Sequence, residues 1–238
     1  MSLQSYFKKQ RQDYASSLST SRSYWHLSAL TYATLKALEK TLSYVKGKTL
    51  DAGAGHQNHK ILVQDNCTEY ISLDIASFAG KIDIVSDITD MNVISTESFD
   101  TVYCSQVLEH VSEPAAALRE IHRVMKPDGH LILSVPHLSG LHDEPYDYYR
   151  YTPYGLRHLL NKTGFVVVEE YRAGGVLSFL SHPLSFALVL SFWAIPMVKW
   201  AAWYFNWFFI VLPAYGLDRC LRLQQKYPAN LVVVAGKK

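Results

Sequence analysis

The order of hydrophobic and polar positions divides the chain into three stretches. Residues 22–46 carry leucines at helical spacing and precede Gly47, so the pattern predicts an N-terminal helix that ends at this glycine. Short apolar runs then alternate with turn and helix signals, at residues 49–52, 70–74, 82–86, 99–105, 130–135 and 165–171. A final run, Leu231–Ala235, follows a long hydrophobic segment. The alternation of short apolar runs with turn and helix signals is typical of an α/β fold with a doubly wound parallel sheet.

Turn and capping residues separate the elements of the second stretch. Ser112 is placed to cap a helix that has Pro114 in its first turn, and a turn at Lys126–Gly129 is expected to end this helix. Thr152 precedes a proline and predicts the start of another helix, which Gly164 closes.

Composition and charge exclude several classes of function and partner. The 238 residues carry a net charge of +2, and the basic residues are scattered, so a nucleic-acid partner is not expected. The polar N-terminus has no signal-peptide pattern, which predicts a cytoplasmic protein. Three cysteines without a CxxC spacing indicate neither disulfides nor a zinc site.

A glycine turn follows the first predicted strand in "LDAGAGHQN". Gly53 and Gly55 let the backbone approach a ligand closely, at the edge of the sheet where such folds bind ligands. A dinucleotide-binding turn would have a third small residue where this chain has Asn58. Asp74 ends the second run and is suited to bind the two hydroxyls of a ribose, while Asp87 ends the third run and is suited to accept from an exocyclic amine.

These motifs, in this order, resemble class I S-adenosylmethionine (SAM)-dependent methyltransferases, particularly the branch of ubiquinone and menaquinone biosynthesis. The similar stretches are "LDAGAG", "SLD", "SDITDM", "FDTVYCSQVLEHV" and "LREIHRVMKPDGHLILSVP". The resemblance implies a Rossmann-like seven-stranded sheet with an antiparallel last strand, and SAM as cofactor. It implies cofactor-binding roles for Asp51, Gly53, Gly55, Asp74, Ile75, Asp87, Ile88 and Gln106.

The sequence departs from the family's pattern at two places. Gln57 stands where the first motif usually has its third glycine. The second and third strands lie too close along the chain for the helix that usually joins them, which predicts a more open or differently covered adenine side.

Methyl transfer needs a positioned acceptor and, for a protonated acceptor, a base. His137 after the fifth strand is the preferred base, and His110 and Glu109 after the fourth strand are the further catalytic candidates. Candidate substrate-binding residues are Tyr24, Trp25, His142, Tyr146, Tyr149 and Arg150. Arg150 could instead pair with an aspartate of its own loop. The dispersed histidines lack the helical spacing of metal ligands, so no metal is expected.

The hydrophobic segment, residues 184–213, is interpreted as an in-plane or re-entrant membrane anchor. Lys199 is the only charged residue from 173 to 217. The final strand must return to the sheet, and Pro183, Pro196 and Pro213 are expected to divide the segment into pieces shorter than the roughly 20 residues that span a bilayer. Trp200, Trp203 and Trp207 share a helical face suited to the interface. The alternatives are an extra helical layer or a homodimer interface.

The sequence therefore predicts a SAM-dependent methyltransferase with a small or lipid-linked acceptor, O-methylation, and a place at the cytoplasmic membrane surface. The expected parts are a helical lid at 1–46, the core at 47–172, the hydrophobic insertion at 173–227 and the final strand at 228–238. An NAD(P)-dependent oxidoreductase and a non-catalytic membrane-bound protein that has kept the SAM fold remain as alternatives.

Overall fold

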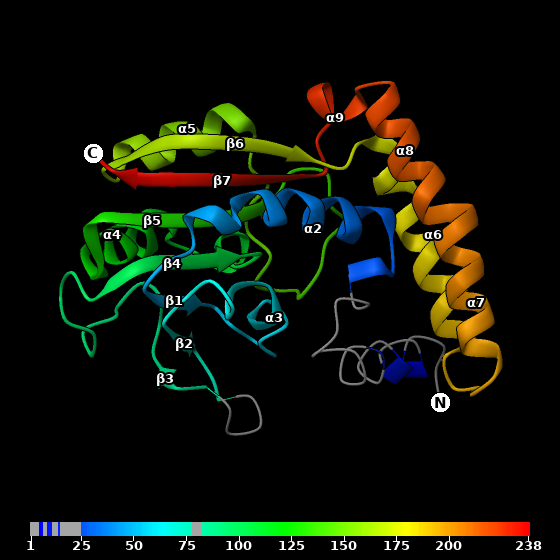
Figure 1. Cartoon of the computed structure of the whole chain (residues 1–238), viewed down its shortest axis with the longest axis horizontal. Helices are drawn as coiled ribbons and strands as arrows, with labels where there is room; N and C mark the ends of the chain where they lie inside the picture. Colours follow the sequence, from blue (N-terminus) through cyan, green and yellow to red (C-terminus); the bar gives the residue numbers. More distant parts are fainter. Residues whose placement is uncertain (1–4, 7–8, 11–13, 15–24, 78–81) are drawn as a thin grey trace. The chain divides into compact units, whose positions relative to one another are not determined.

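A computed structural model describes residues 5–6, 9–10, 14, 25–77 and 82–238. The chain divides into two compact units. The helical unit comprises residues 1–36 and 172–229, and the sheet unit comprises residues 37–171 and 230–238. Figure 1 shows the elements of both units. Tyr24, a predicted substrate-binding residue, lies outside the described residues.

The sheet unit is built around seven strands. Their order across the sheet is β3-β2-β1-β4-β5-β7-β6. The pairs β3–β2, β2–β1, β1–β4 and β4–β5 are parallel, whereas β7 runs antiparallel to β5. The strands are β1 (Lys48–Ala52), β2 (Glu69–Asp74), β3 (Ile84–Val85), β4 (Phe99–Ser105), β5 (Met125–Pro136), β6 (Phe165–Ala173) and β7 (Asn230–Lys237). This arrangement confirms the predicted Rossmann-like sheet with an antiparallel last strand.

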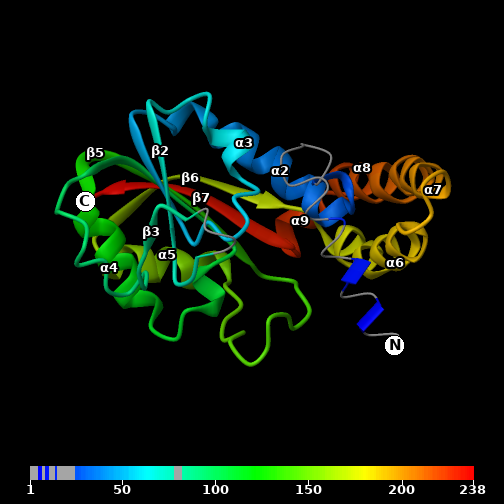
Figure 2. The same ribbon diagram turned by 90° about the horizontal axis from the view of Figure 1, so that it is seen from below.

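Helices cover both faces of this sheet. Figure 2 shows α3 (Lys60–Val63) over one face, and α4 (Pro114–Val124) and α5 (Pro153–Lys162) over the other. In α4 the buried residues recur at helical spacing, because one stripe of the helix packs on the sheet. They are Ala117, Leu118, Ile121 and Val124. The connection between β2 and β3, where the sequence predicted no helix, includes residues 78–81 and so lies partly outside the described residues.

The predicted N-terminal helix is present as α2 (Ala29–Thr41), which continues as a 3₁₀ turn over Leu42–Tyr44. The predicted cap of α4 was wrong. Glu113 rather than Ser112 is the N-cap residue of α4, and its side chain makes no capping hydrogen bond. Residues 126–129 belong to the run of β5 but have no partner on β4, because the register shifts between the pairs Phe99–Met125 and Thr101–His130. The predicted Lys126–Gly129 segment therefore bulges from the sheet directly after α4 ends.

The start of α5 is as predicted. The hydroxyl of Thr152 accepts a hydrogen bond from the backbone N–H of Gly155 at 3.0 Å, so it caps the helix whose first residue is Pro153. Gly164, with a φ of +92°, separates α5 from β6.

The helical unit contains an antiparallel helical hairpin. Its first arm is α6 (Val176–Phe192), and its second arm runs without a break through α7 (Val198–Asn206), a π-helical turn (Trp207–Val211) and α8 (Leu212–Cys220), before the short helix α9 (Leu223–Lys226). Pro183 lies inside α6, and Pro213 lies in the first turn of α8. Only Pro196 lies at a break between helices, so the predicted division at all three prolines is wrong.

Asp218 joins the two arms. Its buried carboxylate accepts hydrogen bonds from the backbone N–H groups of Gly175 and Ser178 at 2.8 Å and of Leu177 at 3.1 Å. The first turn of a helix leaves such donors without partners, and a carboxylate there also interacts favourably with the helix dipole. One side chain of α8 therefore caps α6.

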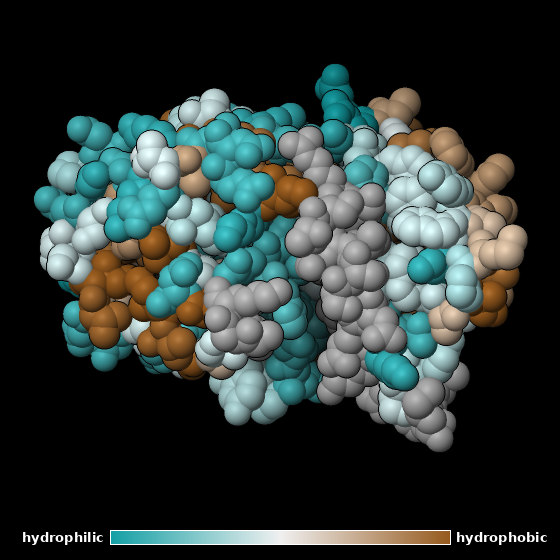
Figure 3. All heavy atoms as spheres, turned by 60° about the horizontal axis from the view of Figure 1, so that its bottom comes forward, coloured by the Kyte–Doolittle hydropathy of each residue, from teal (hydrophilic) through white to brown (hydrophobic). Residues whose placement is uncertain are grey.

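The hairpin exposes many large hydrophobic side chains. Figure 3 shows hydrophobic groups along the right-hand end of the molecule in that view, over the helices. The exposed ones are Leu180, Leu184, Phe192, Ile195, Met197, Val198, Trp200, Tyr204, Phe205, Phe208, Phe209, Leu217 and Leu221. Trp203, by contrast, is buried in a cluster with Tyr14, Leu27 and Trp193. Among the described residues, no helix is both long enough and apolar enough to cross a membrane.

Candidate active site

The glycine turn after β1 has space for no side chain at Gly53. This residue has a φ of +82°, and a Cβ there would lie 2.3 Å from a methyl carbon of Val107. Its N–H donates to the carbonyl oxygen of Leu73 at 2.8 Å, which ties the turn to β2. Both the conformation and the close approach therefore require glycine. The turn continues through Gly55, whose φ is +52°.

Asp74 at the end of β2 is held by two backbone donors. One carboxylate oxygen accepts from the N–H of Gly55 and the other from the N–H of Ile75, both at 2.8 Å. Each oxygen has two lone pairs, so one acceptor position per oxygen remains. The carboxylate is thus oriented and can still accept two hydroxyl protons, as a ribose requires.

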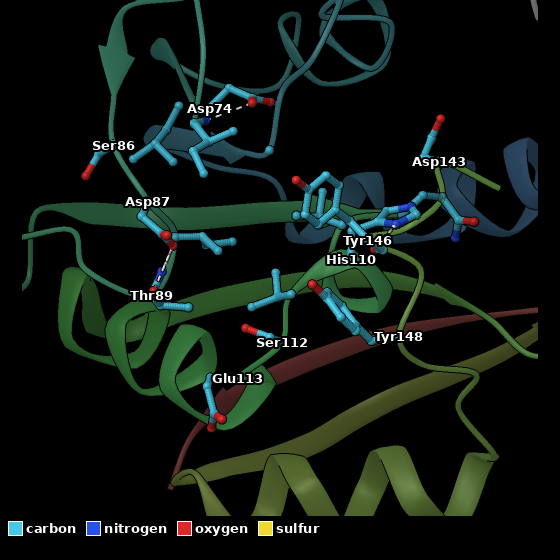
Figure 4. Close-up of a pocket in the computed structure, with 17 residues that line it drawn as sticks. Asp74, Ser86, Asp87, Thr89, His110, Ser112, Glu113, Asp143, Tyr146 and Tyr148 are labelled. Carbon is cyan, nitrogen blue, oxygen red and sulfur yellow. Dashed lines mark hydrogen bonds between the residues drawn. The ribbon is translucent and has the colours of Figure 1, made fainter.

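A cavity of about 660 Å³ opens beside this carboxylate. Figure 4 shows Asp74, Ser86 and Asp87 on one side of it, and His110, Tyr146 and Tyr148 on the other. Its volume lies in the range of small-molecule sites. The lining residues are Gly53, Leu73, Asp74, Ile75, Ser86, Asp87, Ile88, Thr89, Gln106, Val107, His110, Val111, Ser112, Glu113, Asp143, Tyr146 and Tyr148. The cavity therefore brings together most of the predicted cofactor-binding residues.

Gln106 and Asp87 are both held in place within this cavity. The amide nitrogen Nε2 of Gln106 donates to the hydroxyl of Ser134 at 2.9 Å, and the residue has a φ of +57°. A carboxylate oxygen of Asp87 accepts from the N–H and the hydroxyl of Thr89, at 2.8 and 2.7 Å.

Asp51 lies apart from the cavity lining. Its carboxylate is buried and accepts a hydrogen bond from the hydroxyl of Tyr70 at 2.5 Å. Burial raises the pKa of Asp51 to about 7, although the hydrogen bond from Tyr70 opposes this shift. The structure thus places this acid beneath the glycine turn, in the sheet.

The catalytic candidates fall into two groups. His110 lines the cavity, and Glu109 lies buried beside it, with 3.9 Å between Oε1 of Glu109 and Nε2 of His110. Burial raises the pKa of Glu109 to about 8. His142 joins this group, because its Nε2 lies 4.0 Å from the same oxygen. His137 is not among the lining residues, and its Nδ1 lies 3.0 Å from the carbonyl oxygen of Tyr151.

The loop after β5 is ordered largely by its own side chains. The guanidinium of Arg150 binds both carboxylate oxygens of Asp147 at 2.7 Å, which is the pairing within the loop that the sequence left open. This pair holds the pKa of Asp147 well below its usual range. Tyr149 donates its hydroxyl to the carbonyl oxygen of Ser112, whereas Tyr146 lines the cavity. Trp25 belongs to the helical unit, where it is buried.

Sequence reasoning missed one feature of the cavity. Val107 fills the space that a side chain at Gly53 would occupy. Tyr148, from the same tyrosine-rich loop as Tyr146, also lines the cavity, and its N–H donates to the carbonyl oxygen of Glu109 at 2.9 Å. The position of Val107, two residues after the fourth strand, was a usable signal, because the carboxyl ends of parallel strands meet at one edge.

Residues 50–133 match a family described as a methyltransferase domain. The strand order and the antiparallel β7 give the Rossmann-like fold of solved SAM-dependent methyltransferases, and together with this match they confirm the predicted resemblance to class I SAM-dependent methyltransferases. SAM is accordingly the cofactor, as predicted.

The chain is similar to a ubiquinone biosynthesis O-methyltransferase of Xanthomonas oryzae pv. oryzae, with 44% identity over 50 residues. This stretch covers 21% of the present chain and only 21% of that relative's length. The [4+2]-cyclase SpnF matches in structure with a TM-score of 0.56 and 20% identity, over 87% of this chain and 81% of that one.

Another similar structure is the 1,6-didemethyltoxoflavin-N1-methyltransferase of Burkholderia thailandensis with its substrate and S-adenosylhomocysteine bound. It matches with a TM-score of 0.55 and 17% identity, over 100% of this chain and 91% of that one. At such low identity, the two structures support the fold and not a particular reaction.

Proposed function

We propose that this protein transfers a methyl group from SAM to a hydroxyl of a small or lipid-linked acceptor. The observation that carries the proposal is the carboxylate of Asp74, which two backbone N–H groups hold at the edge of the cavity. A carboxylate so held can take both hydroxyls of the cofactor's ribose. The glycine turn and Gln106 line the same cavity and suit the methionine end of the cofactor.

The opposite wall of the cavity suits an acceptor with an apolar or aromatic body and a hydroxyl. Tyr146 and Tyr148 supply aromatic surface there, and His110 supplies a ring nitrogen. O-methylation is further supported by the similarity to a ubiquinone biosynthesis O-methyltransferase. The lining makes His110 a stronger candidate than His137 for direct contact with the acceptor.

In the proposed reaction the acceptor oxygen attacks the methyl carbon in line with the sulfonium. The oxygen–carbon bond forms while the sulfur–carbon bond breaks, which leaves neutral S-adenosylhomocysteine, and the hydroxyl proton passes to a base or to solvent. Such a displacement is accelerated mainly by positioning of the two reactants and exclusion of water.

We further propose that the helical unit attaches the enzyme to the cytoplasmic surface of a membrane. Large hydrophobic side chains are exposed along the hairpin, and Lys199 is the only charged residue from 173 to 217. Met197 at the turn is 88% exposed, so the tip presents apolar surface. In-plane attachment requires such a surface rather than a bilayer-spanning length. An acceptor with a lipid tail would be reached from that position.

Binding and metabolite measurements test this function. Calorimetry should show that the purified protein binds S-adenosylhomocysteine and not NAD. Extracts of a deletion strain should contain a metabolite or lipid that lacks one methyl group relative to the parent strain. Binding of NAD alone would favour an oxidoreductase, and binding of neither ligand would favour a non-catalytic protein.

Sedimentation with liposomes tests the membrane proposal. The full-length protein should co-sediment with vesicles, whereas a variant with residues 176–217 replaced by a Gly/Ser linker should stay in the supernatant and still bind S-adenosylhomocysteine. If the full-length protein is a dimer and does not bind vesicles, the hydrophobic hairpin is instead a homodimer interface.

A further inference from the structure

A cluster of three ligand-type side chains adjoins the cavity. Glu109 and His110 come from the turn after β4, and His142 comes from the loop after β5. One carboxylate oxygen of Glu109 and one nitrogen of each histidine all lie within 4.8 Å of one another. Oε1 of Glu109 lies 3.9 Å from Nε2 of His110 and 4.0 Å from Nε2 of His142. We call these three residues the Glu–His cluster.

Hydrogen bonds to backbone carbonyls orient both histidines. Nδ1 of His110 lies 2.9 Å from the carbonyl oxygen of Tyr146, and Nδ1 of His142 lies 3.1 Å from that of Gly140. A carbonyl oxygen only accepts, so each Nδ1 carries a hydrogen. In the neutral rings each Nε2 then presents a lone pair toward Glu109. Protein-bound metals usually have histidine ligands that are fixed through the other nitrogen in this way.

Arg150 does not alter this assignment. Its Nη2 lies 3.4 Å from Nδ1 of His142, but the same nitrogen donates to Asp147 at 2.7 Å and to the carbonyl oxygen of Gly140 at 2.8 Å. The two hydrogens of Nη2 therefore have closer acceptors.

The carboxylate of Glu109 is buried without a hydrogen-bond donor. Its side chain is 0% exposed, and within the described residues neither oxygen has a hydrogen-bond partner. Arg150 is already engaged by Asp147, so it does not supply the missing partner. Buried carboxylates are normally paired, protonated or bound to a metal. A buried carboxylate and two lone pairs that face one another are complementary to a cation.

We propose that the Glu–His cluster binds one divalent transition-metal ion, such as Zn²⁺. Imidazole nitrogens suit Zn²⁺ and its first-row neighbours, and two histidines with one glutamate leave coordination positions open. Bonds to Zn²⁺ are about 2.0–2.2 Å long, so the three ligand atoms need to close by roughly 1 Å to share an ion.

The ion would face the acceptor side of the cavity, because His110 lines it. This inference rests on the proposed function and adds a means of activating the acceptor. A hydroxyl oxygen bound to the ion has a lowered pKa, so it can lose its proton to solvent before it attacks the methyl carbon. His110 is then a ligand and not the base. The spacing of the histidines along the chain predicted no metal, because His142 lies more than thirty residues from Glu109.

Direct metal titration of the chelator-treated full-length protein tests this site without SAM or acceptor. Calorimetry with Zn²⁺ and visible spectroscopy with Co²⁺ should both give one ion per chain. His142→Ala and Glu109→Gln should each weaken the affinity at least tenfold, in line with the cost of disturbing a metal's ligand shell. His158→Ala, which changes an exposed histidine of α5, is the matched control and should leave the affinity unchanged.

Binding of S-adenosylhomocysteine shows whether each variant is folded. The metal site is wrong if the wild-type protein binds neither ion, or if His142→Ala and wild type bind equally. It is also wrong if His158→Ala weakens binding as much as His142→Ala does. Failure of the wild type to bind S-adenosylhomocysteine would overturn the proposed methyl transfer instead, and the metal titration would stand independently.

Discussion

The two units use hydrophobic residues in opposite ways. In the sheet unit, β7 contributes five consecutive apolar residues, Leu231–Ala235, and all are at most 2% exposed, because a strand inside a layered sheet is covered on both faces. The helical hairpin also consists largely of apolar residues, yet the side chains of Phe208 and Phe209 are 57% and 69% exposed. A two-helix hairpin buries only the seam between its arms. A hydrophobic stretch of sequence therefore forms buried core in the sheet unit, whereas a similar stretch forms exposed surface in the helical unit.

The buried acids of the units differ as well. Asp218 in the helical unit accepts three backbone hydrogen bonds and links two helices. Glu109 in the sheet unit accepts none from the described residues. The hydrogen bonds of Asp218 explain its burial, whereas the carboxyl group of Glu109 needs another partner, such as a proton or the proposed metal ion.

A matched pair of glycine substitutions should give the largest difference between the units. Gly53→Ala should destabilise the sheet unit by about 2–5 kcal/mol, from a positive φ and an overlap with Val107. Gly216→Ala places a methyl group in open space on α8 and should stabilise by about 0.5–1 kcal/mol. Urea denaturation measures both. A Gly53→Ala protein that is as stable as the wild type would show that the turn does not need its glycine.

Loss of the carboxylate at Asp74 should be the next largest effect. Asp74→Ala removes two charge-assisted hydrogen bonds to the cofactor, each worth about 1.5–3 kcal/mol, so the affinity for SAM should fall at least tenfold. Asp128→Ala, an exposed aspartate on β5, is the control and should bind SAM normally. Calorimetry that gives equal affinities for a folded Asp74→Ala protein would remove this residue from the site.

The cap at Asp218 should have a moderate effect that is confined to the helical unit. Asp218→Ala leaves the first turn of α6 without its acceptor and should cost about 1–2 kcal/mol. All five tryptophans, at positions 25, 193, 200, 203 and 207, lie in the helical unit. Tryptophan fluorescence during denaturation therefore reports this unit. An unchanged fluorescence midpoint would contradict the capping role.

Surface substitutions should give the smallest effect and test the contrast in exposure. Phe208→Ser with Phe209→Ser should weaken liposome binding roughly tenfold, since each side chain loses part of the 1.5–3 kcal/mol of a buried apolar group. Val166→Ser with Val168→Ser changes exposed residues of β6 and should leave liposome binding unchanged. Equal losses in the two double variants would mean that the hairpin has no special role in attachment.

Local patterns were sufficient to predict the strands and the cofactor side of the site. The turn at Gly53 and the acid at Asp74 follow directly from their strands, so spacing along the chain reflects proximity in space. The acceptor side was harder to predict. Its Glu–His cluster joins the turn after β4 to a loop more than thirty residues later, and the position of that loop depends on contacts such as Arg150 with Asp147.

The expectation that a proline interrupts a helix also failed at Pro183, where packing keeps the helix continuous. Pro183 costs α6 a backbone hydrogen bond, but its ring is exposed and the flanking Ser178, Ser185 and Val189 are buried along the helix. Tertiary contacts therefore keep the helix continuous despite the proline.

The position of β7 between β5 and β6 sets an order for folding during synthesis. In the sheet, β6 has β7 as its only neighbour. When the ribosome has made β6, its partner is still more than fifty residues away, beyond the entire hairpin. The strand "FVVVEE" therefore has no partner strand while the hydrophobic helices are being synthesised. Chains with unpaired strand edges and exposed hydrophobic surface are the ones that chaperones protect. Completion of the sheet therefore requires a long-range contact that cannot form until the whole hairpin has been synthesised.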